Sequence, residues 1–189
     1  MSVSYIFPSF IARKRCNFDI EKIVDYLYSL REEDPEGLKC SNQMGWHSSY
    51  LAEDKKILFY LKNIIPNMKE LIDEIGLSVN GINLHTMWST INPPGSYNLS
   101  HVHAMCNLSG VLYLKVPSNS GSICFENPLD NCGLFDKMKN QEFTGSFGQY
   151  ELVPEPNMLL LFHPNQRHYV QNNNSLEDRI SISFNSTLF

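Results

Sequence analysis

The sequence lacks an extended basic segment. Its 189 residues carry a net charge of −5, and the largest cluster of lysine and arginine is the short run Arg13–Arg15. Proteins that bind nucleic acid usually present a basic face, so we expect no nucleic-acid partner. No apolar run is long enough to span a bilayer, so we expect no membrane partner either. The apolar stretch from Tyr5 to Ala12 is broken by Pro8 and followed by its positive charges, which is not the pattern of a secretory signal.

The cysteines show no pattern typical of a disulfide or metal site. The five cysteines form no Cys-x-x-Cys pair, and their number is odd: Cys16, Cys40, Cys106, Cys124 and Cys132. This distribution argues against a disulfide framework and a zinc ribbon, and it indicates a reducing compartment. We therefore expect a cytoplasmic protein. A chain of this length can bury enough surface to fold without a metal, so a bound metal should serve chemistry.

The first half of the sequence, about residues 17–76, is expected to be helical. Asp19 can cap a helix that ends before Pro35, because apolar residues recur on one helical face. A second helical stretch is expected over Ala52–Ile65, with a break and a restart at Pro66. Gly76 is a plausible helix end.

The second half, about residues 80–186, is expected to form strands. Short apolar or β-branched segments alternate with turn residues; they are Ile82–Ile91, Gly110–Val116, Ser122–Phe125, Asn157–Phe162, His168–Gln171 and Arg179–Phe184. Many short strands at close spacing indicate a jelly roll, or double-stranded β-helix. We thus predict one α+β domain over residues 1–189, mainly β with N-terminal helices. The long polar stretch Asn127–Phe147 is a candidate lid.

Three of the six histidines occupy positions suited to metal binding. His101 and His103 flank Val102 at an expected strand start, where residues two apart point to the same face. His168 lies on a later strand that a jelly roll can bring close. Three ligands on one side of a metal leave positions free for substrate and dioxygen, as in facial non-haem iron sites. The alternative is that these histidines only make hydrogen bonds.

An arginine and a serine follow the third histidine. Arg179 and Ser181 are two residues apart on the last expected strand, so they share a face. A guanidinium fork beside a hydroxyl suits the far carboxylate of a small diacid. The alternative is that Arg179 pairs with Asp178 or Glu177 at the surface.

Further motifs extend this pattern from Ser41 to Asn185. They are Ser41-Asn42, Gly45-Trp46-His47-Ser48, Trp88, Gly95-Ser96-Tyr97-Asn98, Ser109-Gly110-Val111-Leu112-Tyr113-Leu114, Phe162-His163-Pro164, His168-Tyr169-Val170 and Arg179-Ile180-Ser181-Ile182-Ser183-Phe184-Asn185. Together with His101-Val102-His103, they resemble a family of 2-oxoglutarate- and Fe(II)-dependent oxygenases of phages and marine bacteria. These oxygenases are relatives of the prolyl hydroxylases.

The resemblance implies a metal site with one unusual ligand. His101, His103 and His168 match the iron ligands, but most of the wider superfamily has aspartate or glutamate at the position of His103. Three neutral imidazoles leave the full charge of Fe(II) in place, which should favour an anionic cosubstrate and alter the redox potential of the iron.

The resemblance also implies a cosubstrate site. Arg179 matches the residue that binds the distal carboxylate of 2-oxoglutarate, with Ser181 assisting. Tyr113 resembles a tyrosine that contacts the same carboxylate in prolyl hydroxylases. Trp88 and Asn98 are expected to line the site.

The activity implied is that of a dioxygenase with Fe(II) as cofactor and 2-oxoglutarate and O2 as cosubstrates. It would hydroxylate an unidentified small-molecule or peptidyl substrate and release succinate and CO2. Oligomeric state is left open, a homodimer included, and a phage-encoded protein would work in the host cytoplasm. Two alternatives stay open: a cupin-like three-histidine dioxygenase without 2-oxoglutarate, and a non-catalytic jelly-roll binding module. The glutamate that cupins carry after the second histidine is missing from Ala104–Leu108.

Three other histidines receive separate predictions. His47, beside Trp46, is a candidate for the pocket. His163 is expected behind the metal ligands or exposed, and His85 in the core.

Overall fold

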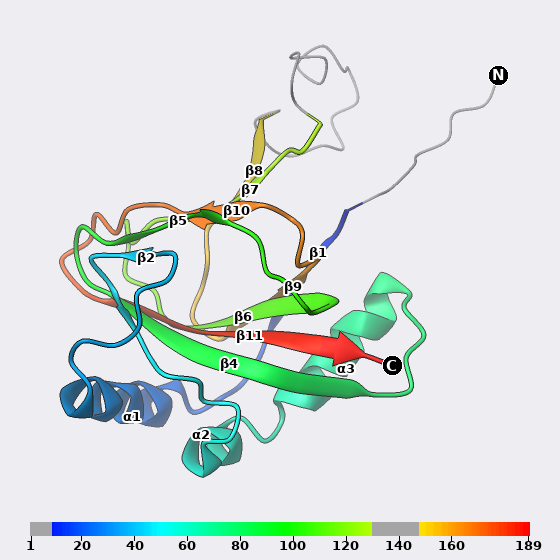
Figure 1. Cartoon of the computed structure of the whole chain (residues 1–189), viewed down its shortest axis with the longest axis horizontal. Coiled ribbons are helices and arrows are strands. Elements are labelled where there is room, and N and C mark those ends of the chain that lie inside the picture. Colours follow the sequence, from blue (N-terminus) through cyan, green and yellow to red (C-terminus); the bar gives the residue numbers. More distant parts are fainter. Residues whose placement is uncertain (1–8, 130–147) are drawn as a thin grey trace.

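The computed structural model describes residues 9–129 and 148–189. Within these ranges, two antiparallel sheets face each other and helices cover the outer face of the larger one (Figure 1). The predicted fold, a mainly β jelly roll with N-terminal helices, is confirmed.

The larger sheet has six strands in the order β1-β9-β6-β11-β4-β3. Their bounds are Ile11–Arg15 (β1), Met158–Phe162 (β9), Leu108–Lys115 (β6), Arg179–Leu188 (β11), Ile82–Asn92 (β4) and Trp46–His47 (β3). Strands β4 and β11 are the longest of these, and they pair along almost their whole length.

The smaller sheet has five strands in the order β2-β5-β10-β7-β8. Their bounds are Asn42–Gln43 (β2), Tyr97–His101 (β5), His168–Val170 (β10), Ile123–Glu126 (β7) and Gln149–Leu152 (β8). In Figure 1 the strands β2, β5 and β10 lie across one part of β4 and β11, whereas the end where β4 begins and β11 finishes extends beyond them.

Three helices precede the long strands in the described residues: α1 (Ile20–Glu33), α2 (Lys55–Tyr60) and α3 (Ile64–Ile75). The predicted end at Gly76 is confirmed, because this glycine is the C-cap of α3 with a φ of 83°. The predicted break at Pro66 is wrong. Helix α3 already begins at Ile64, and a proline in the first turn removes an N–H that has no partner within the helix.

Alternation of side chains along the central strands separates two apolar clusters. On β6, Leu112 and Leu114 face the helices, whereas Val111 and Tyr113 face the smaller sheet. The face of β11 that points toward the smaller sheet is polar, unlike the same face of β6. It carries Arg179 and the polar residues that alternate with the buried isoleucines. A large apolar core therefore joins the helices to the larger sheet, and the space between the sheets is partly polar.

Several strands escaped prediction. Strand β1 precedes the part expected to be helical, and the two-residue strands β2 and β3 lie within that part; β5 and β8 were also missed. Most of the stretch proposed as a lid, Asn127–Phe147, lies outside the described residues, as does Cys132. None of the helices in residues 9–129 and 148–189 is long and apolar enough to cross a bilayer.

Candidate metal and cosubstrate site

A cavity of about 820 Å3 lies between the two sheets. Its lining includes the predicted site residues from both sheets: Trp88, Asn98, His101, His103, Tyr113, His168, Arg179 and Ser181. The alternation of β11 explains part of this arrangement, because Arg179 and Ser181 point inward while Ile180 and Ile182 pack in the helix-side core. The fold thus brings all eight residues into one space.

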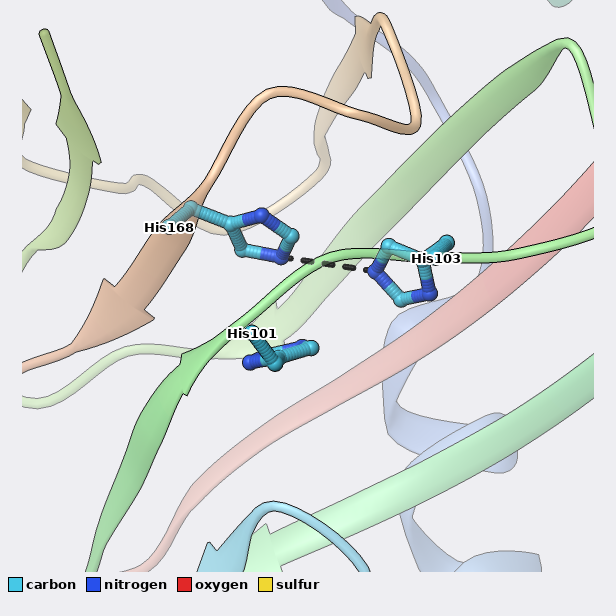
Figure 2. A group of neighbouring side chains, drawn as sticks. All are labelled: His101, His103 and His168. Carbon is cyan, nitrogen blue, oxygen red and sulfur yellow. Dashed lines mark hydrogen bonds between the residues drawn. The ribbon is translucent and has the colours of Figure 1, made fainter. Parts of the chain in front are cut away.

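Three histidines converge at one point of this cavity (Figure 2). His101 is the last residue of β5 and lies opposite His168, the first residue of β10. One ring nitrogen from each of His101, His103 and His168 lies within 4.8 Å of the others. The expectation that His101 starts a strand is wrong, because the strand ends there. His103 follows in a non-strand segment, where its backbone N–H donates to Pro164 O at 2.9 Å.

Backbone carbonyls fix the tautomers of two of these rings. His101 Nδ1 lies 2.7 Å from Leu99 O, and His168 Nδ1 lies 2.8 Å from Gln166 O. A ring nitrogen beside a carbonyl must carry the proton, so Nε2 of each ring keeps its lone pair. The Nε2 atoms of His103 and His168 are 3.4 Å apart. This is the arrangement of imidazoles that ligate a metal through Nε2.

Burial keeps the three imidazoles neutral. It lowers the pKa of His103 to about 4 and that of His168 to about 3, with the neighbouring His101 adding to both shifts. The pKa of His101 is also lowered, chiefly by burial. Neutral imidazole is the form that binds metal ions, so the cluster is ready to bind one at neutral pH.

The guanidinium of Arg179 is buried and only partly satisfied. Arg179 is 2% exposed, and its Nη1 donates to the carbonyls of Ser120, Gln171 (3.3 Å) and Gly121 (3.5 Å). Its Nη2 is buried without a hydrogen-bond partner among the described residues. Buried donors are nearly always paired, so an unpaired one at a cavity wall fits an absent anionic ligand.

Surface pairing of Arg179 is not observed. Asp178 instead accepts a hydrogen bond from Tyr28 at 3.0 Å, and Glu177 forms an ion pair with Lys115 at 3.0 Å. The alternative role for Arg179 is therefore wrong.

Hydroxyl groups line the same cavity as the arginine. Ser181 Oγ lies 3.1 Å from Thr90 Oγ1, and both residues are buried. Tyr113 is also buried, which raises the pKa of its phenol, although the nearby charge of Arg179 opposes the shift. One guanidinium with neutral hydroxyl donors suits a carboxylate.

Asn98 and Trp88 approach the site from opposite sheets. Asn98 Oδ1 accepts from Asn92 Nδ2 at 3.1 Å, and Asn98 Nδ2 donates to Ser41 Oγ at 3.2 Å. The Trp88 ring stacks on His47 at 5.7 Å and 7°, and it lies 5.7 Å from the ring of His103. Trp88 thus supports one of the three converging histidines.

The remaining histidines fall in different surroundings. His47 lines the cavity and His163 is exposed, as expected. The prediction that His85 lies in the core is wrong, because His85 also lines the cavity.

Sequence reasoning missed two cavity residues near the arginine. Thr90 lies opposite Ser181, and Asn92 lies opposite Arg179, in the β4–β11 register. Only the strand register could have identified them, and register is not visible in a single sequence.

The family comparison agrees with this geometry. Residues 86–185 match the model of the family described as "Putative 2OG-Fe(II) oxygenase". The chain belongs to this family. The oxygenase uses Fe(II) and 2-oxoglutarate, and the three-histidine cluster fits iron binding. No curated protein sequence matches the chain.

Solved structures show that the oxygenase shares its fold with other proteins. A Pseudomonas putida prolyl-4-hydroxylase is 14% identical, with a TM-score of 0.59 over 93% of this chain and 91% of that chain. A viral collagen prolyl hydroxylase of Paramecium Bursaria Chlorella virus-1, in its 2-oxoglutarate complex, is 9% identical, with a TM-score of 0.61 over 94% and 95%. HygX from Streptomyces hygroscopicus, with nickel, 2-oxoglutarate and hygromycin B bound, is 12% identical, with a TM-score of 0.63 over 95% and 83%.

Proposed function

We propose that His101, His103 and His168 bind the Fe(II) of this oxygenase, and that Arg179 binds the distal carboxylate of 2-oxoglutarate. One observation carries the proposal: three neutral imidazoles converge in the same cavity as a buried guanidinium whose Nη2 has no partner within residues 9–129 and 148–189. The side chains provide neutral nitrogen ligands for a cation and a cation for an anion. Iron bound there would supply the activation of dioxygen that couples 2-oxoglutarate decarboxylation to hydroxylation of a substrate.

The residues around Arg179 orient the cosubstrate. Carbonyl groups hold Nη1, so the guanidinium is fixed and presents Nη2 to the ligand. Ser181 and Tyr113 add hydroxyl donors to the same carboxylate. Arg179 is the only formal cation among the described lining residues, so it alone can neutralise the charge of this carboxylate. The net charge of −5 makes this local cation necessary.

Two further residues act on the ligands through packing and hydrogen bonds. Trp88 holds the ring of His103 in place from the larger sheet. Asn98 connects the smaller sheet to Asn92, so that the two sheets keep a fixed spacing beside the cosubstrate. Both residues are positioning residues in this proposal.

The broader setting follows from the same considerations. We infer one oxygenase domain over residues 1–189, acting in a cytoplasm on a small-molecule or peptidyl substrate. Nucleic acid and membrane are not expected as partners, because the sequence has no long run of lysine and arginine and no long apolar segment. A homodimer is compatible with this activity and is not required by it.

Turnover of 2-oxoglutarate without an added substrate tests the proposal. Protein loaded with Fe(II) should convert 2-oxoglutarate to succinate slowly, and the His103→Ala variant should not. A protein that binds iron but consumes no 2-oxoglutarate would contradict the proposed cosubstrate site at Arg179. A His103→Ala variant with undiminished turnover would remove His103 from the metal site.

A further inference from the structure

Strand β4 contains an irregularity on the cavity side. The β4–β11 register places Asn185 opposite Thr86 and Ser186 opposite Leu84, so His85 is an extra residue in β4. Such a bulge can turn two successive side chains to the same face. Here both His85 and Thr86 line the cavity.

The two bulge side chains carry unpaired polar atoms. His85 Nε2 and Thr86 Oγ1 are buried and have no hydrogen-bond partner among the described residues. A buried polar atom without a partner is costly, and a strand could avoid the cost with an apolar residue. Two adjacent examples on a cavity wall indicate a ligand that pairs with them.

The bulge lies on the other side of the histidine cluster from the cosubstrate arginine. Along paired β4 and β11, Arg179 lies opposite Asn92, Trp88 opposite Ser183, and Thr86 opposite Asn185. The ring of Trp88 contacts that of His103, so the metal site lies between the two ends of this row. A molecule at the bulge would be next to the iron without displacing 2-oxoglutarate.

The cavity wall around the bulge is polar and uncharged. Its neighbours on the same strands are Asn83, Ser183, Asn185 and Thr187, and the described lining residues include no aspartate, glutamate or lysine. Arg179 is the one formal cation in that lining, and it lies six residues along β11 from Asn185. This end of β4 and β11 also extends beyond β2, β5 and β10 (Figure 1).

We propose that His85 and Thr86 bind the primary substrate of the oxygenase, and that the bound part is an uncharged group rich in hydroxyl or amide functions. The inference rests on the proposed metal and cosubstrate sites, because these define which end of the cavity is left for the substrate. A hydroxyl or amide group both donates and accepts, so it can pair with the imidazole nitrogen and the threonine hydroxyl at once. A charged group would find no opposite charge at the bulge and would lose its hydration.

Matched pairs of small probes test the charge preference. Protein loaded with Ni(II) and 2-oxoglutarate does not turn over, so binding can be followed by saturation-transfer NMR and titration. One pair is N-acetylglycinamide and N-acetylglycine; the other is methyl glucoside and the corresponding glucuronide carboxylate. We expect the neutral member of at least one pair to bind at least about tenfold more tightly than its charged partner. The pair whose neutral member binds shows whether the bound group of the substrate is an amide or a polyol.

Variants test the role of the bulge residues. Thr86→Val removes a hydroxyl with little change in shape, and His85→Ala removes the imidazole. Each variant should bind the neutral probe about 2- to 10-fold more weakly, which is the effect of one lost hydrogen bond. The affinity for 2-oxoglutarate should be unchanged. The control, Asn63→Ala, changes an exposed residue at the start of α3 and should alter neither affinity.

The outcomes separate this inference from the proposed function. Three results would overturn the substrate site: equal binding of neutral and charged probes, no binding of either neutral probe, or undiminished binding of the neutral probe to Thr86→Val and His85→Ala. Each of these results would leave the cosubstrate site intact. A wild-type protein that fails to bind 2-oxoglutarate would overturn the cosubstrate site, and the inference with it.

Discussion

At the scale of single residues, Arg179 is constrained more tightly than a surface cation. Backbone carbonyls hold its Nη1, and its Nη2 is buried with no hydrogen-bond partner in the part of the chain that the structure describes. Losing a hydrogen-bonded charge partner in a buried site costs roughly 2–5 kcal/mol, or about 30-fold to several-thousand-fold in affinity. We therefore expect Arg179→Ala to raise the dissociation constant for 2-oxoglutarate by at least about 30-fold, measured calorimetrically without oxygen.

Two comparisons make this experiment specific. Arg179→Lys should recover only part of the affinity, because an ammonium group cannot reproduce the planar guanidinium. Iron content should be the same in both variants, since Arg179 is not among the converging histidines. Unaltered affinity in Arg179→Ala would place the diacid elsewhere in the cavity.

His168 gives the metal-free protein a pH-dependent stability. Its pKa is about 3 in the folded protein, because the ring is buried, whereas an unfolded histidine titrates near 6.5. Below about pH 6.5 the unfolded chain binds more protons, so the free energy of unfolding should decrease as the pH falls. Urea unfolding of metal-free protein at pH 7.5 and 5.5 measures this effect. His168→Gln should show a smaller difference between the two pH values, and an equal difference would contradict the prediction.

Residue types were predictable from the sequence, and their exact surroundings were not. The spacing of His101 and His103 correctly suggested that both face one space, although the strand ends at His101. Thr90 and Asn92 could not be found, because their position beside Ser181 and Arg179 depends on the pairing of β4 with β11. His85 was misplaced because a bulge changes the direction of its side chain.

At the scale of elements, two helix starts provide a matched pair. Asp54 caps α2, since Oδ1 accepts from the backbone N–H groups of Lys56 and Ile57 at 2.9 and 2.8 Å. Asn63 occupies the same position in α3 but makes no side-chain cap bond.

We expect Asp54→Ala to lower the free energy of unfolding by about 1 kcal/mol or slightly more, because the cap is lost together with the hydrogen bond from Tyr26. Asn63→Ala should change it by less than about 0.5 kcal/mol. Chemical denaturation of both variants measures the difference. Equal losses in the two variants would show that the hydrogen bonds of Asp54 do not stabilise α2.

Long periodic elements were predictable, and short ones were not. Helix α1 and strands β4, β6, β9 and β11 have clear apolar periodicity, and they lie close to where the sequence indicated. Strands β2 and β3 have two residues each and exist only because β5 and β4 offer partners. The helix break near Pro66 was misplaced because a proline is tolerated in the first turn of a helix.

At the scale of the whole molecule, the two sheets have different tasks. The larger sheet is apolar on its helix side and carries Arg179, Ser181 and Trp88 on its cavity side. The smaller sheet contributes His101 and His168 from the adjacent ends of β5 and β10. Two of the three proposed metal ligands therefore lie on the smaller sheet and the proposed cosubstrate anchor on the larger one, so neither sheet alone contains the complete proposed site.

The most direct test is an anaerobic titration of Fe(II) and 2-oxoglutarate, followed by metal analysis and by the charge-transfer absorption of the complex. The account predicts one iron per chain in the wild-type protein and an absorption band that appears on addition of 2-oxoglutarate. In His103→Ala, iron binding should be greatly weakened, because affinity depends on the complete ligand set. Full iron occupancy and an unchanged band in His103→Ala would contradict the three-histidine site.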